Sequence, residues 1–161
     1  MRARDVALAG LMIVASSTVW AQNVSVVTLS PGGFGHAHSF TWSQDSNVAL
    51  MVTPVLVEEI TSQTREQLEN VGLSLVTRDD FQPADLLVRL GCFKPSESPP
   101  LTLTIELYDG KSKALIWRGE ARDLLNQADS QASLLIVDRI IAKMFEHFPY
   151  HLNGWVSAVR R

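Results

Sequence analysis

The sequence predicts a two-layer α+β domain, in which a largely antiparallel sheet of about five or six strands carries two amphipathic helices on one face. Two observations support this fold class. Aliphatic and polar residues alternate over 101–108, and apolar residues recur at every third or fourth position over 57–71 and 134–148. Alternation is typical of a strand with one covered face, and the helical spacing is typical of a helix with one apolar stripe. We therefore expect the helices to cover the alternating strands.

The alternating residues form a predicted β-hairpin between positions 101 and 122. Its first arm, 101–108, places four aliphatic side chains on one face, and its second arm, 115–122, repeats the alternation. The intervening residues 109–113 have the sequence DGKSK, which is typical of a turn. The two arms are therefore expected to pair as antiparallel neighbours.

The turn also suggests a register for this hairpin. The expected inner-face pairs are Leu107 with Leu115, Ile105 with Trp117, and Leu103 with Gly119. In this register Trp117 lies in the core, while Glu106 and Arg118 are diagonal neighbours that form an ion pair on the outer face. Gly119 has no side chain, so it leaves room for a helix to lie close over the sheet.

Both helices are predicted from their apolar stripes and their ends. The first starts at Thr53, whose hydroxyl is expected to cap it, has Pro54 at its first position, and ends at Gly72. The second runs from Ser130 to Phe148 and is stopped by the proline that follows. The first stripe comprises Val57, Ile60, Thr64, Leu68 and Val71, and the second comprises Leu134, Val137, Ile140, Ile141, Met144, Phe145 and Phe148. We interpret both stripes as core because these residue types are usually buried.

Four further strands complete the predicted sheet. They are Val24–Leu29, Ser39–Trp42, Leu73–Thr77 and Asp85–Phe93. The last of these contains three consecutive apolar residues, which favours a central position in the sheet. Residues 30–35, 78–83 and 95–100 are rich in proline, glycine or polar residues and are interpreted as loops.

The N-terminal segment 1–21 is interpreted as a secretory signal peptide. Arg2 and Arg4 precede an apolar run, Val6–Ala15, and Ala21 completes a small-residue cleavage site. The apolar run is shorter than the roughly 20 residues that span a bilayer, so no stable membrane insertion is expected after cleavage. The sequence thus predicts a periplasmic protein with one domain at 22–149 and a C-terminal tail at 150–161.

Composition narrows the classes of partner. The formal net charge of the chain is −3, and removing the predicted signal peptide removes two arginines and one aspartate. Nucleic acids and anionic membranes favour a concentrated basic face, so neither is expected as a partner. The single cysteine, Cys92, lies within a predicted strand and has no intrachain partner. It is expected to be a buried, inert thiol.

Several of these segments together resemble a bacterial envelope family known as domain of unknown function four-one-three-six. The residues that carry the resemblance are Phe40-Thr41-Trp42, 84–88 (ADLLV), 103–109 (LTIELYD), 115–121 (LIWRGEA) and the helix that closes on Phe148-Pro149. The resemblance implies a protein of the Gram-negative envelope. Many family members look like lipoproteins, whereas this chain has no lipid-accepting cysteine at the predicted cleavage site. The family has no assigned activity, and therefore implies none for this chain.

The candidate site residues are mostly histidines. His36 and His38 would share one face of an extended segment, where two imidazoles could begin a metal site, but no third ligand follows at a fixed spacing. His147 and His151 are separated by a helix-breaking proline. The glycine-rich stretch 32–35 lacks the lysine and hydroxyl residue of a phosphate-binding loop. We therefore assign no metal, cofactor or catalytic residue.

The sequence favours a non-enzymatic role. The leading hypothesis is a periplasmic binding or accessory module that engages an envelope protein or a small ligand. A first alternative is a small metal-dependent or hydrolytic enzyme that uses His36 and His38. A second alternative is a self-assembling structural protein, because hairpin edges and apolar tails favour association.

Overall fold

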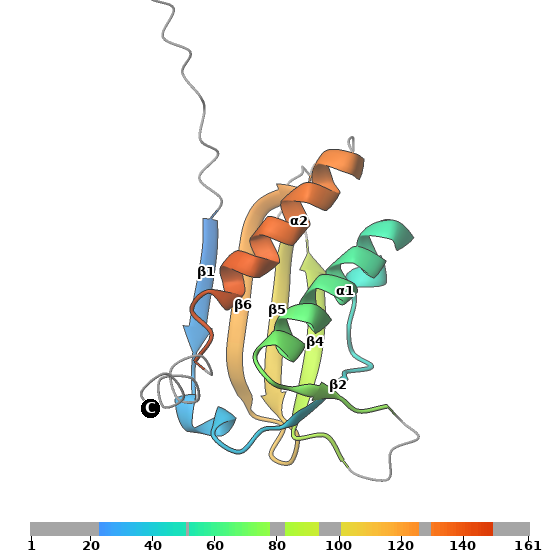
Figure 1. The fold of residues 1–161 in the computed structure, drawn as a ribbon. Helices are drawn as coiled ribbons and strands as arrows, with labels where there is room; N and C mark the ends of the chain where they lie inside the picture. Colours follow the sequence, from blue (N-terminus) through green and yellow to red (C-terminus); the bar gives the residue numbers. More distant parts are fainter. Residues whose placement is uncertain (1–22, 51, 78–82, 94–100, 126–129, 150–161) are drawn as a thin grey trace, which may run out of the picture.

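The computed structural model describes residues 23–50, 52–77, 83–93, 101–125 and 130–149 (Figure 1). These residues form a six-stranded sheet with the strand order β1-β6-β5-β4-β2-β3, and two helices cover one of its faces. The strands are β1 (Asn23–Thr28), β2 (Ser39–Trp42), β3 (Ser74–Leu75), β4 (Leu86–Phe93), β5 (Leu101–Asp109) and β6 (Leu115–Leu125). The helices are α1 (Pro54–Asn70) and α2 (Ser130–Phe145), with 3-10 turns η1 (Pro31–Phe34) and η2 (Val48–Leu50). The predicted fold class is confirmed, whereas the predicted signal peptide and tail lie outside the described residues.

The sheet is mixed but mostly antiparallel. Strands β1, β6, β5 and β4 pair antiparallel in that order, and β2 then runs parallel to both β4 and β3. Strand β4 lies between β5 and β2, so its predicted interior position is confirmed. Its residues alternate between buried and half-buried, because the helices cover only one face of the sheet.

The predicted register of the hairpin is wrong by two residues. Leu107 lies opposite Trp117, Ile105 opposite Gly119, and Leu103 opposite Ala121. One residue of the shift is present at the turn, where Leu115 pairs with Tyr108 and not with Leu107, and a bulge at the unpaired Ile116 adds the second. Beyond the bulge a slip of two residues keeps each side chain on its face, so the alternation alone does not distinguish the two registers. Glu106 and Arg118 are consequently direct partners, not diagonal neighbours.

Gly119 has the predicted role beneath a helix. A Cβ atom at this position would lie 2.8 Å from the Trp117 ring and 2.9 Å from the sulfur of Met144 in α2. Both distances are shorter than real Cβ contacts, so a larger residue would force α2 away from the sheet.

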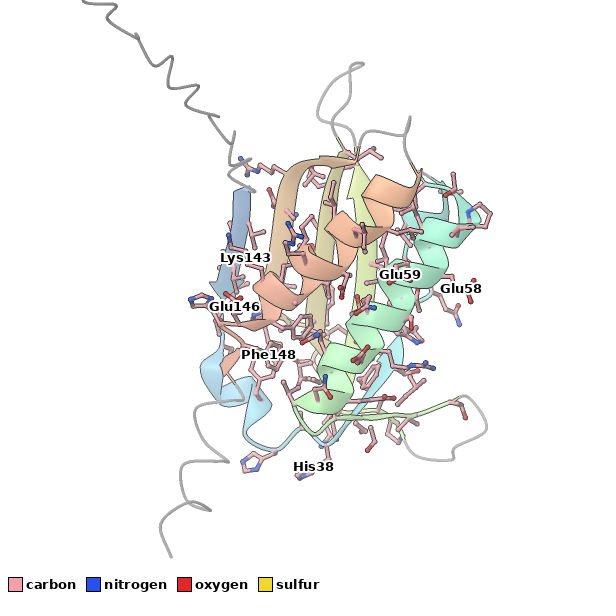
Figure 2. All side chains as sticks on the ribbon, turned by 45° about the horizontal axis from the view of Figure 1, so that its top comes forward. His38, Glu58, Glu59, Lys143, Glu146 and Phe148 are labelled. Carbon is pink, nitrogen blue, oxygen red and sulfur yellow. The ribbon has the colours of Figure 1, made fainter. Side chains whose placement is uncertain are left out.

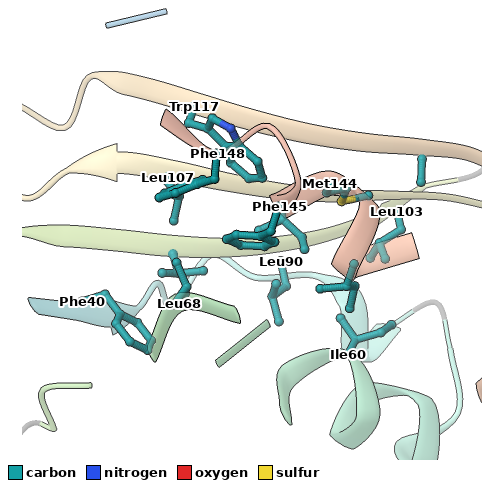
Figure 3. Close-up of a cluster of buried hydrophobic side chains, with 14 of the residues drawn as sticks. Phe40, Ile60, Leu68, Leu90, Leu103, Leu107, Trp117, Met144, Phe145 and Phe148 are labelled. Carbon is teal, nitrogen blue, oxygen red and sulfur yellow. The ribbon is translucent and has the colours of Figure 1, made fainter. Parts of the chain in front are cut away.

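The core lies between the helices and the inner face of the sheet (Figure 3). Helix α1 buries Leu56, Ile60, Thr64 and Leu68, and α2 with the turn after it buries Val137, Ile140, Ile141, Met144, Phe145 and Phe148. The predicted stripes are therefore confirmed except at their starts, since Val57 and Leu134 are only partly buried. Trp117 packs against Phe145 and Phe148, with ring centroids 5.2 and 5.3 Å apart.

The element ends differ from the prediction in three places. Thr53 is the N-cap residue of α1, but its hydroxyl makes no capping hydrogen bond. Helix α2 ends at Phe145, and a turn then brings Phe148 into the core. The strand predicted at 73–77 is reduced to Ser74–Leu75, because β2 offers it only two paired positions. Gly72 ends α1 with a φ of 94°, as its residue type predicts.

Neither helix in the described part of the chain has the length and apolarity needed to cross a membrane.

Candidate functional site

The two histidines singled out from the sequence lie at the start of β2. His36 lies in a turn and His38 directly precedes β2, and both are exposed on either side of the buried Ala37. No group of three or more His, Cys, Asp or Glu side chains suited to a metal ion occurs in the described ranges. The structure therefore adds no third ligand to this pair.

Asp85 organises the backbone next to these histidines. Its Oδ2 accepts hydrogen bonds from the N–H of His38 at 3.0 Å, from the N–H of Ser39 at 3.1 Å, and from the Ser39 hydroxyl at 2.8 Å. These bonds stabilise the charged carboxylate, and the His38 N–H contributes most to lowering the pKa of Asp85. Asp85 thus ties the start of β2 to the start of β4.

The other residues considered from the sequence have structural roles. Cys92 is 1% exposed, and burial raises the pKa of its thiol to about 11, which confirms an inert cysteine. The glycine-rich stretch forms η1, where the buried Phe34 meets the Phe148 ring edge-on at 5.0 Å. It closes one end of the core. His151 lies outside the described residues.

The outer face of the sheet holds a network of charged side chains. Glu106, which is 9% exposed, lies 3.7 Å from Arg89 and 3.5 Å from Arg118, and it accepts a hydrogen bond from the Tyr108 hydroxyl at 2.8 Å. Burial, followed by this hydrogen bond, raises the pKa of Tyr108. The predicted pairing of Arg118 with Glu106 is confirmed, and Trp117 lies on the opposite face in the core.

This network extends across the hairpin but satisfies its charges internally. Glu120 lies 3.7 Å from Arg118, and it accepts a hydrogen bond from Arg122 at 2.6 Å. Because each glutamate contacts two arginines, the network stabilises the framework of the sheet.

A first groove lies between β2 and α1, and we call it the Trp42 groove. It has a volume of about 330 Å³ and is lined by Trp42, Glu58, Thr61, Ser62 and Arg65. The four α1 residues lie on one side of the helix because their spacing follows the helical repeat. Figure 2 shows Glu58 on this helix, on the side of the molecule remote from Lys143.

The Trp42 groove combines an aromatic wall with polar groups. Trp42 is partly buried, and its ring meets that of Phe40 edge-on at 5.8 Å, which holds the indole in place. The Thr61 hydroxyl donates to the Val57 carbonyl at 2.7 Å, so its lone pairs are available as acceptors. Glu58 and Arg65 add an acceptor and a donor of opposite charge. Such a set suits a ligand with one apolar face and several hydroxyl groups.

A second groove lies between β1 and the C-terminal end of α2, and we call it the Lys143 groove. It has a volume of about 370 Å³ and is lined by Val24, Val26, Thr28, Lys143 and His147. Lys143 and His147 are exposed and four residues apart. Figure 2 shows Lys143 on the side of α2 that faces β1.

Sequence reasoning missed both grooves. Each combines residues of a strand near the N-terminus with residues of a helix that follows later in the chain. In the sequence these grooves are represented only by isolated residues, such as Trp42 at the end of a strand and Lys143 in the last turn of a helix. Only the topology of the sheet brings these residues together.

Residues 94–150 match the model of a family described as Domain of unknown function (DUF4136). The match covers the hairpin and α2, so the predicted resemblance is confirmed for this segment. A search of curated protein sequences finds no match to this chain.

The fold is also similar to solved structures. Two structures of the PelC dodecamer from Paraburkholderia phytofirmans share 15% and 14% identity with this chain, each with a TM-score of 0.52. These matches cover 83% and 80% of this chain, and 99% and 96% of the PelC chain. A PDZ domain protein from Parabacteroides distasonis shares 18% identity with a TM-score of 0.53, over 78% of this chain and 35% of that protein. At these identities the similarity concerns the fold alone.

Proposed function

We propose that this protein is an exported binding module of the bacterial envelope, and that its Trp42 groove holds a saccharide unit. The predicted signal peptide and the envelope family that residues 94–150 resemble support the location. The observation that carries the binding role is the Trp42 groove itself, where an aromatic wall faces two charged groups and two hydroxyls.

A saccharide matches this set of groups. The C–H face of a sugar ring packs on an indole, and its hydroxyls both donate and accept hydrogen bonds. Glu58 accepts, Arg65 donates, and Thr61 and Ser62 supply oxygen acceptors along the same wall. The groove is open rather than enclosed, which favours one unit of a longer chain over a small sealed ligand.

Titration with a panel of neutral, acidic and amino-sugar oligosaccharides tests the binding role. Binding should alter the fluorescence of Trp42, and Trp42→Ala should weaken binding by about twofold to tenfold, since aromatic stacking contributes about 0.5–1.5 kcal/mol. Arg65→Gln should also weaken binding, while Glu66→Gln, an exposed change on the same helix outside the groove, should leave it unchanged. Failure of every sugar class to bind would reject this role.

The location is tested separately by mass spectrometry of the protein recovered from the periplasm of a Gram-negative host. The mature chain should begin at Gln22, because cleavage is predicted after Ala21. Recovery of the uncleaved chain from the cytoplasm would contradict export.

Self-assembly is a second candidate function, and exposed apolar side chains favour it. Leu50, Val55 and Leu135 are 84%, 59% and 72% exposed, and they belong to elements that start at the same end of the helical layer (Figure 1). The similarity of the fold to a PelC dodecamer gives this candidate further support. Light scattering of the wild type and of Leu135→Glu tests it. A monomeric wild type would reject it.

A further inference from the structure

Strand β1 forms one end of the sheet and has a free edge among the described residues. Its six residues pair only with β6 in that part of the chain, and neither described helix lies beyond it (Figure 1). An unpaired strand edge offers a row of N–H and C=O groups to another extended chain.

The backbone direction identifies which residues of β1 face this edge. The N–H of Leu29 donates to the carbonyl of Ile116 in β6 at 2.9 Å. Residues of an antiparallel strand alternate between those that bond to the partner and those that point away from it. Ser25 and Val27 therefore bond to β6, whereas Val24, Val26 and Thr28 direct their N–H and C=O groups to the free edge.

The side chains of these same three residues line the Lys143 groove. Val24, Val26 and Thr28 form one wall, and Lys143 and His147 form the other. A strand added to β1 would place every second side chain on the same face of the sheet as this groove. The backbone of the added strand would then bond to β1, and its side chains would contact the adjoining Lys143 groove.

We propose that β1 and the Lys143 groove receive an extended acidic segment of a partner protein, which adds a strand to the sheet. A carboxylate on the face toward the helices would meet the Lys143 ammonium and the His147 imidazole. Glu146 is exposed next to them but does not line the groove. This proposal names a partner for the proposed binding module, but it uses a different site from the saccharide.

Charge excludes two other occupants. Strand β1 has the sequence NVSVVT, so a second copy paired through β1 would bring no carboxylate to Lys143. Residues 150–161 contain no Asp or Glu, so this segment lacks the acidic side chain as well. A separate acidic segment is the occupant that matches the Lys143 ammonium of the groove.

The first experiment uses a peptide of alternating valine and threonine, about ten residues long, with glutamates at two positions on one face. A matched peptide carries glutamine at both positions. The glutamate peptide should bind to the exported protein at least about threefold more tightly, the size expected for an exposed ion pair. Amide exchange should slow at Val24, Val26 and Thr28, while Ser25 and Val27 are already protected.

Two variants locate the binding. Lys143→Gln should abolish the preference for glutamate, and Arg139→Gln, an exposed change about one turn earlier on α2, should preserve it. Val26→Pro should prevent binding of both peptides, because it removes an N–H that faces the free edge and bonds to no described strand. Trp42→Ala should bind the peptide normally, so this site and the saccharide site can fail independently.

Three outcomes would overturn the proposal. The first is equal affinity for the glutamate and glutamine peptides. The second is an unchanged preference in Lys143→Gln. The third is a β1 edge that is already protected from exchange before peptide is added, in a protein that light scattering shows to be a dimer, since a second copy then occupies the edge.

Discussion

The free edge of β1 and the outer edge of β4, which the short β2 pairs only in part, are protected in different ways. Strand β2 pairs with only the first residues of β4. The loop after β2 continues this pairing, because the N–H of Ser43 donates to the Val88 carbonyl at 2.7 Å and the N–H of Asn47 donates to the Leu90 carbonyl at 3.1 Å. Side chains complete this cover, because Ser46 Oγ accepts from the Leu90 N–H and Asn47 Oδ1 from the Cys92 N–H. On the opposite side, β1 ends the sheet with six residues and no such cover among the described residues.

This difference indicates that the β4 edge contributes to the stability of the fold, whereas the β1 edge is available for binding. Proteins usually block an exposed strand edge, since it promotes association with other chains. Here a loop blocks the β4 edge with side-chain hydrogen bonds, whereas β1 has an open backbone beside a groove that contains two basic side chains. The contrast yields four predictions, ordered from the largest expected effect to the smallest.

Proline substitution should destabilise the fold to very different extents at two neighbouring residues of β1. Val27→Pro removes a hydrogen bond to β6 and should lower the free energy of unfolding by about 2–4 kcal/mol. Val26→Pro removes an N–H that faces the open edge, so it should cost less than about 1 kcal/mol. Urea unfolding measures both values. Equal losses would show that both edges of β1 are paired.

Asn47→Ala should weaken the cover over β4. It leaves the N–H of the buried Cys92 without its acceptor, which should cost about 1–3 kcal/mol. Asn47→Asp keeps the oxygen and is the matched control. The Cys92 thiol should react with iodoacetamide faster in Asn47→Ala than in the wild type, because its burial and raised pKa suppress reaction in the intact fold. If neither the reactivity nor the stability changed, the Asn47 hydrogen bond would not protect the edge of β4, and the Ser46 hydrogen bond would do so alone.

Asp85→Asn should reduce stability in a pH-dependent way. The folded state lowers the pKa of Asp85, chiefly through the His38 N–H, so the carboxylate stabilises the fold above its unfolded pKa of about 4. This contribution is lost as the pH falls through the lower folded pKa. The difference between wild type and variant should therefore shrink as the pH falls below about 4, which thermal unfolding across this range would measure. A constant difference would mean that the charge of Asp85 plays no part.

Lys143→Gln should have the smallest effect on the fold. Lys143 is exposed, and substitutions at such positions usually change stability by less than about 0.5 kcal/mol. The melting temperature should match that of Arg139→Gln. A large loss would mean that Lys143 stabilises the end of α2 and is not kept for a ligand.

Sequence periodicity predicted the two layers of this fold, because a repeat of two residues is typical of a strand and a repeat of three to four residues is typical of a helix. The alternation in β5 and β6 and the stripes of α1 and α2 assigned the inner face almost residue by residue. The register of the hairpin was wrong because the turn shifts the pairing by one residue and the bulge at Ile116 shifts it by another, so that side chains beyond the bulge keep their predicted faces. Register depends on the turn and the bulge, and the alternation carries no information on either.

The grooves and the covered edge were beyond sequence reasoning for a different reason. Ser46 and Asn47 lie in a polar loop, where many such residues make no specific contact, and only the parallel placement of β2 brings them to β4. His36 and His38 illustrate the converse, because their spacing drew attention to a metal site while the fold adds no third ligand among the described residues.

The edge-on contact between Phe34 and Phe148 has a consequence for biogenesis. It joins residues more than a hundred positions apart, and β1 likewise needs β6 as its partner. The hydrophobic interior stays incomplete until nearly the whole polypeptide has been made and released. If the chain is exported as we propose, this late closure would keep it competent for transport until Phe148 arrives on the far side of the membrane.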